Sequence, residues 1–333
     1  MARVNYVQTK TPTWMQAVWD LLAAELVAHG SYSLVETVNS PGGMPCAVYK
    51  CSGSTSPLGR DWYLAVARVA ANPGSLYVAV AEGYDSATKS LIRPAPGTAY
   101  NSTVPATDGS YGGGVGYPIW TGTTGSTLNN VDIRWQLFGP ASATAVDCWT
   151  VVSRKGIYSW GHAPGRSSNF NFGTYVGWVE PLQASDPGIL VVGDYLNRTL
   201  ATDSASMVTT RHPTITTATG ATWQWMSPSN GAAAWTPSTG QVNGRGDRLF
   251  NGRPIGGRRL LRTNIDSAVY GDFRGLYPDL LNISTSGGGT TGDSVMPGEM
   301  MTIYDQAGAG STYIYCYRYG SSSNELWVNT TPP

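Results

Sequence analysis

The side chains best suited to binding chemistry gather in one stretch of the chain near residue 250. This stretch holds six arginines and one acid, Asp247, although the whole chain balances 21 basic against 21 acidic side chains. Guanidinium groups pair in bidentate fashion with carboxylates and phosphates. Three interpretations are open: a solvated loop with local salt bridges, a contact with an acidic patch on another subunit, or a site for a polyanion. The six candidates are Arg245, Arg248, Arg253, Arg258, Arg259 and Arg262.

Three tryptophans form a second group of candidates. Trp223, Trp225 and Trp235 lie in a polar, turn-rich region of the sequence. Exposed aromatic rings of this kind stack on sugar rings, and they also serve in hydrophobic cores and at subunit interfaces. They are therefore candidate ligand-contact residues for a carbohydrate.

No catalytic constellation is distinguishable in the sequence. A glycosidase needs two carboxylates about 5–10 Å apart, and Glu180 with Asp186 or Asp266 with Asp272 could supply them. With 21 acids in the chain, however, some such pair always occurs. There is no Gly-x-Ser-x-Gly elbow for a nucleophilic serine. We expect no enzymatic activity and no cofactor.

The cysteines and histidines are too few and too scattered for a tetrahedral zinc site. There are three histidines and no CxxC pair. The spacing of Cys46 and Cys51 would allow a bridge across a hairpin. The favoured interpretation is that Cys46, Cys51, Cys148 and Cys316 are semi-buried thiols of a protein made in a reducing cytoplasm.

Composition excludes several classes of protein. Charged residues make up 13% of the 333-residue chain, about half the usual share. A net charge of zero argues against a nucleic-acid binder, which needs a basic surface. No apolar run approaches the ~20 residues of a membrane span, and no signal peptide is visible. So low a charge indicates a surface that neighbouring copies cover.

One amphipathic helix is expected, from Trp14 to His29. Its apolar residues recur at spacings of three and four, and Gly30 can provide the left-handed C-terminal cap. Thr13 followed by Gln16 indicates a capping box at the start. Trp14 and Trp19 are candidate interface residues, because the helix could pack on its own domain or dock on a neighbouring subunit.

The sequence after the helix predicts short antiparallel strands separated by turns. The fold class is mainly β, with sandwich or barrel-like domains and the one N-terminal helix. A weak boundary near residue 140 suggests domains at 1–140 and 141–333, and the second carries a long polar insertion at 195–245. The segment 86–130 is expected to be a loop. The expected strands are 33–38, 47–51, 62–70, 76–82, 131–138, 146–153, 156–160, 175–179, 189–192, 300–304, 312–319 and 326–328.

Three stretches of the chain resemble structural proteins of tailed bacteriophages. The first runs from Tyr32-Ser33-Leu34-Val35-Glu36 to Asp61-Trp62-Tyr63-Leu64-Ala65-Val66, the second from Cys148 through Ile157 to Gly173–Leu182, and the third covers Gly271–Tyr277, Gly292–Val295 and Leu326–Val328. Together they span about a third of the chain, and none is a catalytic signature. The chain departs from those proteins after Asp186-Pro187-Gly188, where it makes its long polar excursion.

The resemblance implies a particle component of the tail, baseplate or neck. Such a protein would be assembled in the host cytoplasm, would be found in the virion, and would have copies of itself and other virion proteins as partners. No nucleic-acid or membrane partner is expected. The alternatives are a virion module that binds host-surface carbohydrate and, less favoured, a polysaccharide-degrading enzyme.

Overall fold

A computed structural model describes the following residues of the chain: 19–20, 22–24, 26–56, 59–68, 76–95, 116–121, 127–138, 147–162, 172–181, 189–194, 207–209, 223–226, 248–250, 253–256, 260–263, 273–276, 280–284, 300–304, 308, 310–318 and 324–330. Strands predominate among them, and every ladder described below is antiparallel. One short helix precedes the first strand. The expected mainly-β fold with a single N-terminal helix is confirmed.

The helix includes residues 19–20, 22–24 and 26–28, and it packs on its own chain. Leu22 and Leu26 are buried, and Trp19 packs against the same hydrophobic cluster. Gly30 has a φ of +79° and donates its N–H to the carbonyl of Val27, so it provides the expected C-terminal cap. The capping box and Trp14 lie outside the described residues. No helix in the described ranges has both the length and the apolar character that crossing a bilayer requires.

The first sheet has seven strands in the order β1-β2-β3-β4-β5-β6, with β9 paired to β4. Strands β1 to β6 follow one another in the sheet in the order of the sequence, as sequential strands commonly do. Their bounds are β1 Tyr32–Asn39, β2 Pro45–Cys51, β3 Trp62–Arg68, β4 Leu76–Asp85, β5 Ser90–Pro94, β6 Gly116–Pro118 and β9 Gln136–Phe138.

Both faces of the first sheet are buried along its central strands β2, β3 and β4. Successive side chains of a strand point to opposite faces, so in β4 Val78 and Val80 belong to one hydrophobic cluster and Ala79 and Ala81 to another. We name them the inner core, which also contains the helix residues and Trp62, and the outer core, which contains Leu91, Ile119 and Ile133. Burial on both faces explains why these strands are continuously apolar.

Two expectations about the segment from residue 86 to residue 138 are wrong in part. Residues 86–130 are not one long loop, because β5 and β6 lie within them, as do β7 (Trp120–Thr121) and β8 (Thr127–Leu128). The strand expected at 131–138 is confined to β9. Residues before β9 form a turn instead, in which Asn129 Oδ1 accepts the N–H of Asp132 and the Asn129 carbonyl accepts that of Ile133.

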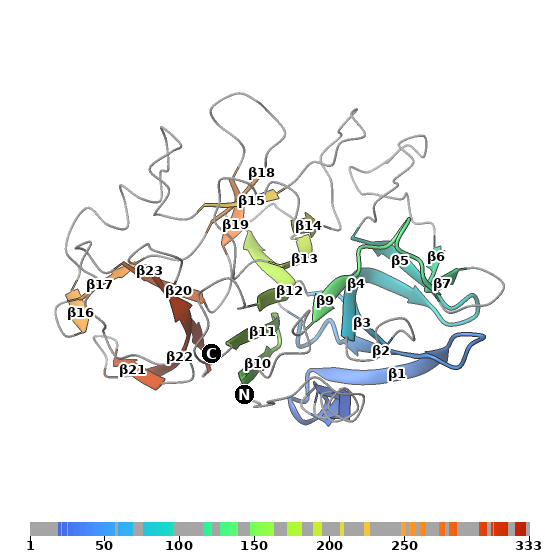
Figure 1. The fold of residues 1–333 in the computed structure, drawn as a ribbon, viewed down its shortest axis with the longest axis horizontal. Coiled ribbons are helices and arrows are strands. Elements are labelled where there is room, and N and C mark those ends of the chain that lie inside the picture. Colours follow the sequence, from blue (N-terminus) through green and yellow to red (C-terminus); the bar gives the residue numbers. More distant parts are fainter. Residues whose placement is uncertain are drawn as a thin grey trace.

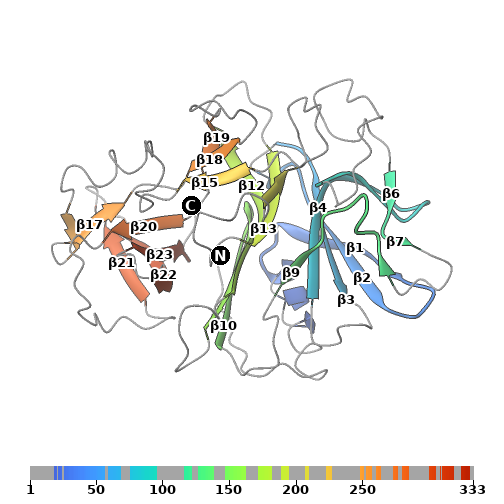
Figure 2. The ribbon, with the colours of Figure 1, turned by 45° about the horizontal axis from the view of Figure 1, so that its top comes forward.

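The second sheet packs against the inner face of the first (Figures 1 and 2). Its strands are β10 Asp147–Ser153, β11 Gly156–His162, β12 Phe172–Pro181, β13 Ile189–Asp194, β14 Met207–Thr209, β15 Trp223–Met226, β18 Leu260–Thr263 and β19 Phe273–Leu276. Val152, Ile157, Val176 and Val192 of this sheet join the inner core. The two sheets therefore form the two layers of a sandwich.

A third sheet lies on the far side of the second in both views (Figures 1 and 2). Its order is β16-β17-β20-β23-β22-β21. The bounds are β16 Arg248–Phe250, β17 Arg253–Gly256, β20 Leu280–Ser284, β21 Met300–Tyr304, β22 Gly310–Arg318 and β23 Asn324–Asn329. The boundary expected near residue 140 lies outside the described residues, between strands of two sheets that share the inner core. The division into two domains stays a prediction.

Cys46 and Cys51 are free, buried thiols at opposite ends of β2. Their odd spacing along one strand places Cys46 in the outer core and Cys51 in the inner core, which precludes a bridge between them. The expectation of free thiols is confirmed for these two residues, which are fully buried and not semi-buried. Cys148 and Cys316 lie in β10 and β22, and their side chains are outside the described part.

Candidate functional site

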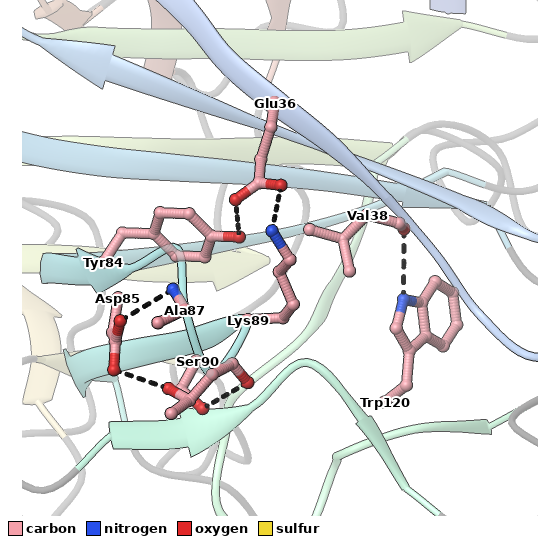
Figure 3. A network of polar contacts seen from close by, with 9 residues as sticks. Glu36, Val38, Tyr84, Asp85, Ala87, Lys89, Ser90 and Trp120 are labelled. Atoms are coloured by element: carbon pink, nitrogen blue, oxygen red, sulfur yellow. Dashed lines mark hydrogen bonds and ion pairs between the residues drawn. The ribbon is translucent and has the colours of Figure 1, made fainter.

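The best-defined polar cluster lies over the outer core and converges on strand β1 (Figure 3). Glu36 of β1 accepts hydrogen bonds on both carboxylate oxygens, from the hydroxyl of Tyr84 at 2.6 Å and from the ammonium of Lys89. Tyr84 lies in β4 and Lys89 directly precedes β5. In the order of the sheet, two strands separate β1 from β4. The contact therefore spans the sheet's face, and we call these three residues the latch.

A tight turn sets the position of Lys89. The carboxylate of Asp85 accepts the N–H of Ala87 at 2.9 Å and the hydroxyl of Thr88 at 2.7 Å. Lys89 then takes a φ of +54°, in the left-handed region that non-glycine residues rarely adopt. This conformation ends the turn and starts β5, so the lysine side chain reaches β1 from a fixed backbone.

The latch is built to hold fixed charges. Hydrogen bonds from Lys89 and then from Tyr84 lower the pKa of Glu36, so its carboxylate stays ionised at neutral pH. Burial, and then the neighbouring Glu36, raise the pKa of Tyr84 far above its usual range. A permanently ionised acid beside a permanently protonated phenol cannot exchange a proton near neutral pH. The arrangement favours a mechanical role.

A second contact links β1 to the segment that packs over the outer core. The indole N–H of Trp120, in β7, donates to the carbonyl of Val38 at 3.2 Å (Figure 3). Asn129 in turn donates its side-chain amide to the carbonyl of Pro118 at 3.0 Å. The segment that follows β5 is thereby held onto the first strand of the sheet.

The turn between β10 and β11 joins the two sheets through one buried and one partly buried hydrogen bond. Its Ser153 carbonyl accepts the hydroxyl of Tyr32 at 2.6 Å, and its Arg154 carbonyl accepts the thiol of Cys51 at 3.7 Å. Burial raises the pKa of Tyr32 and, to about 11, the pKa of Cys51. Both groups stay protonated and act as donors. The turn between β10 and β11 is therefore part of the sandwich's framework.

The structure separates the arginines predicted as one functional block. Arg248 and Arg253 lie in β16 and β17, a hairpin of the third sheet, whereas Arg262 lies in β18 of the second sheet. The interpretation of the stretch as a solvated loop is thus incomplete, because three short strands run through it. Arg245, Arg258 and Arg259 are outside the described residues, and so are the side chains of the other three.

One ladder brings two predicted groups onto neighbouring strands. In β15, Trp223 pairs with Thr263 of β18 and Trp225 pairs with Leu261. Arg262 is opposite Gln224, between those two pairs. The two groups are about forty residues apart in the sequence, and the pairing of β15 with β18 places them on neighbouring strands. Trp235 lies outside the described residues.

The carboxylate pairs considered for catalysis lie outside the described residues, apart from the backbone of Glu180. Glu180 lies in β12, while Asp186, Asp266 and Asp272 fall outside them. Within the described ranges, no three His, Cys, Asp or Glu side chains are grouped as metal ligands.

The latch was not found by sequence reasoning. Its residues are 48 and 53 positions apart along the chain, and no spacing rule connects them. One local signal was available. The run Asp85-Ser86-Ala87-Thr88 is typical of a turn capped by an aspartate, which would have placed a hairpin inside 86–130.

Two of the three stretches quoted in the sequence analysis contribute to the inner core of the sandwich. Trp62, Leu64 and Val66 of the first stretch and Ile157 and Val176 of the second belong to the inner core. In comparisons with family models and with curated proteins, the chain has no match.

Proposed function

We propose that the chain is a non-enzymatic structural component of a bacteriophage particle, from its tail, baseplate or neck. It acts by assembling with copies of itself and with other virion proteins. The edge of the first sheet carries this proposal. The virion setting is supported by the resemblance of the three stretches, of which the first two contribute residues to the inner core.

Strand β1 presents an open edge with apolar side chains. It pairs with β2 on one side and ends the order of the described sheet. Leu34 is 50% exposed and Val35 is 41% exposed. The strand holds no lysine or proline, the residues that usually protect an edge from pairing with another chain. Such an edge is suited to association between subunits.

A β-bulge limits how readily this edge pairs. The register with β2 shifts between Leu34 and Glu36, which leaves Val35 unpaired. Bulges twist an edge strand and hinder its uncontrolled addition to other strands. An edge that is apolar but bulged fits a protein that stays dispersed until its proper partner is present.

The experiment is to replace the exposed apolar pair with charges. A Leu34→Lys, Val35→Lys double variant should keep its circular dichroism spectrum and lose incorporation into particles. Val131→Lys is the matched control, because Val131 is 44% exposed and lies outside the edge strand. Normal incorporation of the double variant would contradict the proposal.

Binding of host-surface carbohydrate is the second candidate. The β15–β18 ladder supports it, since Trp223, Trp225 and Arg262 share two paired strands. Aromatic residues at alternate positions of one strand are suited to stacking on sugar rings. Binding of the wild type to a glycan array, lost in Trp223→Ala and Trp225→Ala variants, would favour this candidate. If the wild type bound no glycan on the array, the sugars tested would be excluded as ligands.

A further inference from the structure

The charges of strands β1 and β2 indicate which partner fits the edge that β1 forms. Glu36 is the only charged side chain of β1, and Lys50 is the only one of β2. Glu36 is neutralised by Lys89 (Figure 3), and Lys50 forms an ion pair with Asp61 at 2.6 Å. Each charge on these two strands is therefore balanced within the chain.

An edge with balanced charges can pair with its own copy. In an antiparallel pair about a two-fold axis, each strand meets the same sequence running in the opposite direction. An unbalanced charge near the axis would then lie close to its like, which destabilises a strand pair. A strongly acidic or basic strand of another protein would meet no unbalanced charge of opposite sign on β1 or β2. The charges thus favour a second copy of this chain.

The exposed apolar residues lie close to the middle of β1. Leu34 and Val35 are the third and fourth of its eight residues, and their side chains are 50% and 41% exposed. With the axis near them, the leucine and valine of one copy contact those of the other and lose their contact with water, which favours association. Ser33 and Thr37, also exposed, lie on either side and can form hydrogen bonds across the strand pair.

The β-bulge keeps this association weak. The register with β2 shifts between Leu34 and Glu36, so β1 cannot pair regularly along its whole length on its open side. Only a short stretch near the axis is left for pairing. The chain is therefore expected to be monomeric when dilute and to pair where many copies are concentrated.

We propose that β1 pairs with β1 of a second copy, antiparallel about a two-fold axis near Leu34 and Val35. This inference rests on the function proposed above, because it names the partner of the same edge. The two first sheets form one continuous sheet across the axis. Lys89 permits the contact by neutralising Glu36 in each copy, so the latch controls association as well as holding β4 and β5 against β1.

The test is sedimentation equilibrium of the purified full chain over a range of concentrations. The wild type should show a monomer–dimer equilibrium. Leu34→Lys and Leu34→Glu should each weaken dimerisation about tenfold or more, because like charges then meet at the axis. An equimolar mixture of these two variants should regain association, since a lysine of one copy then meets a glutamate of the other. Val131→Lys is the matched control and should sediment like the wild type, because Val131 is 44% exposed and lies outside the edge strand.

A second set of variants tests the control by the latch. Lys89→Gln leaves the charge of Glu36 unbalanced, and it should weaken dimerisation several-fold, most strongly at low salt, where screening is weakest. Adding Glu36→Gln to that variant removes the charge and should restore the dimerisation of the wild type. Circular dichroism checks that each variant is folded. Wild-type dimerisation of Lys89→Gln at low salt would overturn the role of the latch.

Three results would overturn the pairing of β1 with its copy: a wild type that stays monomeric up to about 1 mM, Leu34 variants that dimerise like the wild type, or a mixture that associates no better than its components. The proposed function fails separately. Normal incorporation of the Leu34→Lys, Val35→Lys variant into particles would contradict that function even if the chain dimerises. A monomeric wild type whose double variant is lost from particles would assign the edge to another virion protein and overturn only the self-pairing.

Discussion

Gly156 of β11 and Gly177 of β12 face each other across their ladder so closely that neither position has room for a side chain. A Cβ on Gly177 would lie 2.4 Å from the Cα of Gly156 and 2.4 Å from the carbonyl oxygen of Lys155. The hydroxyl of Tyr175 lies 2.9 Å and 3.0 Å from a Cβ placed on Gly156 and Gly177, and it donates to the carbonyl of Trp178. An aromatic residue thus protects a glycine pair that lets two strands approach.

Replacing Gly177 with alanine should destabilise the protein by about 3 kcal/mol, the upper range for overpacking a core. The new methyl group would meet backbone atoms, which cannot rotate away, and the φ of +150° adds strain. Denaturant unfolding measures the change. Gly43→Ala is the control: its φ is +78° and no atom lies within 4 Å of the added Cβ, so only the left-handed backbone is penalised, by about 1–2 kcal/mol. Equal losses in the two variants would contradict the close approach.

The latch predicts a loss of stability in acid. The pKa of Glu36 is lower in the fold than its usual value of 4.5, so the carboxylate stabilises the fold above pH 4.5. This contribution is lost as the pH falls from 4.5 through the folded-state pKa. Glu36→Gln should remove that part of the pH dependence and cost at most about 1 kcal/mol at pH 7, because the pair is near the surface. A variant that keeps the wild-type acid profile would show that Glu36 does not hold the strands together.

His29 predicts a second acid-sensitive step, at higher pH. Burial, followed by the positive charges of the N-terminus and Arg154, lowers the pKa of His29 from 6.5 to about 4. The unfolded chain therefore binds a proton more readily, and stability should fall as the pH decreases from 6.5 and level off below about 4. His29→Gln should flatten the melting temperature between pH 6.5 and 4.5. An unchanged slope in that interval would contradict the assignment.

The thiols of Cys46 and Cys51 should resist modification in the native protein. Burial raises the pKa of both thiols, that of Cys51 to about 11, so few thiolates form at pH 8. An aromatic disulfide reagent should label them only after denaturant is added. A Cys46→Ala, Cys51→Ala variant should react like the wild type under native conditions and show two fewer thiols in denaturant. If the native wild type were labelled faster than the native double variant, β2 would have to open readily.

The first sheet could be predicted from sequence wherever apolar residues occupy long strands. The predicted 62–70 and 76–82 overlap β3 and β4, because Leu64, Val66, Val78 and Val80 lie in runs long enough to be distinguished. The segment after β5 could not be predicted. Strands of two or three residues, such as β7 and β8, show no alternation, and Ser90 pairs with Pro118 across a gap that no local rule spans.

The candidate sites were least predictable, for a different reason. Glu36, Tyr84 and Lys89 are ordinary surface residue types, and only the folding of β4 and β5 over β1 brings them together. The arginine block was visible as composition, yet its members Arg253 and Arg262 belong to different sheets. Residue type indicates which chemistry is possible, whereas strand pairing decides which side chains meet.

The central claim is that this chain is a fixed structural part of a phage particle. Quantitative mass spectrometry of purified particles tests it most directly. The account predicts that peptides of this chain occur at a constant ratio to the other structural proteins across independent preparations. Their absence from particles whose other proteins are detected, or a ratio that falls as purification proceeds, would contradict it.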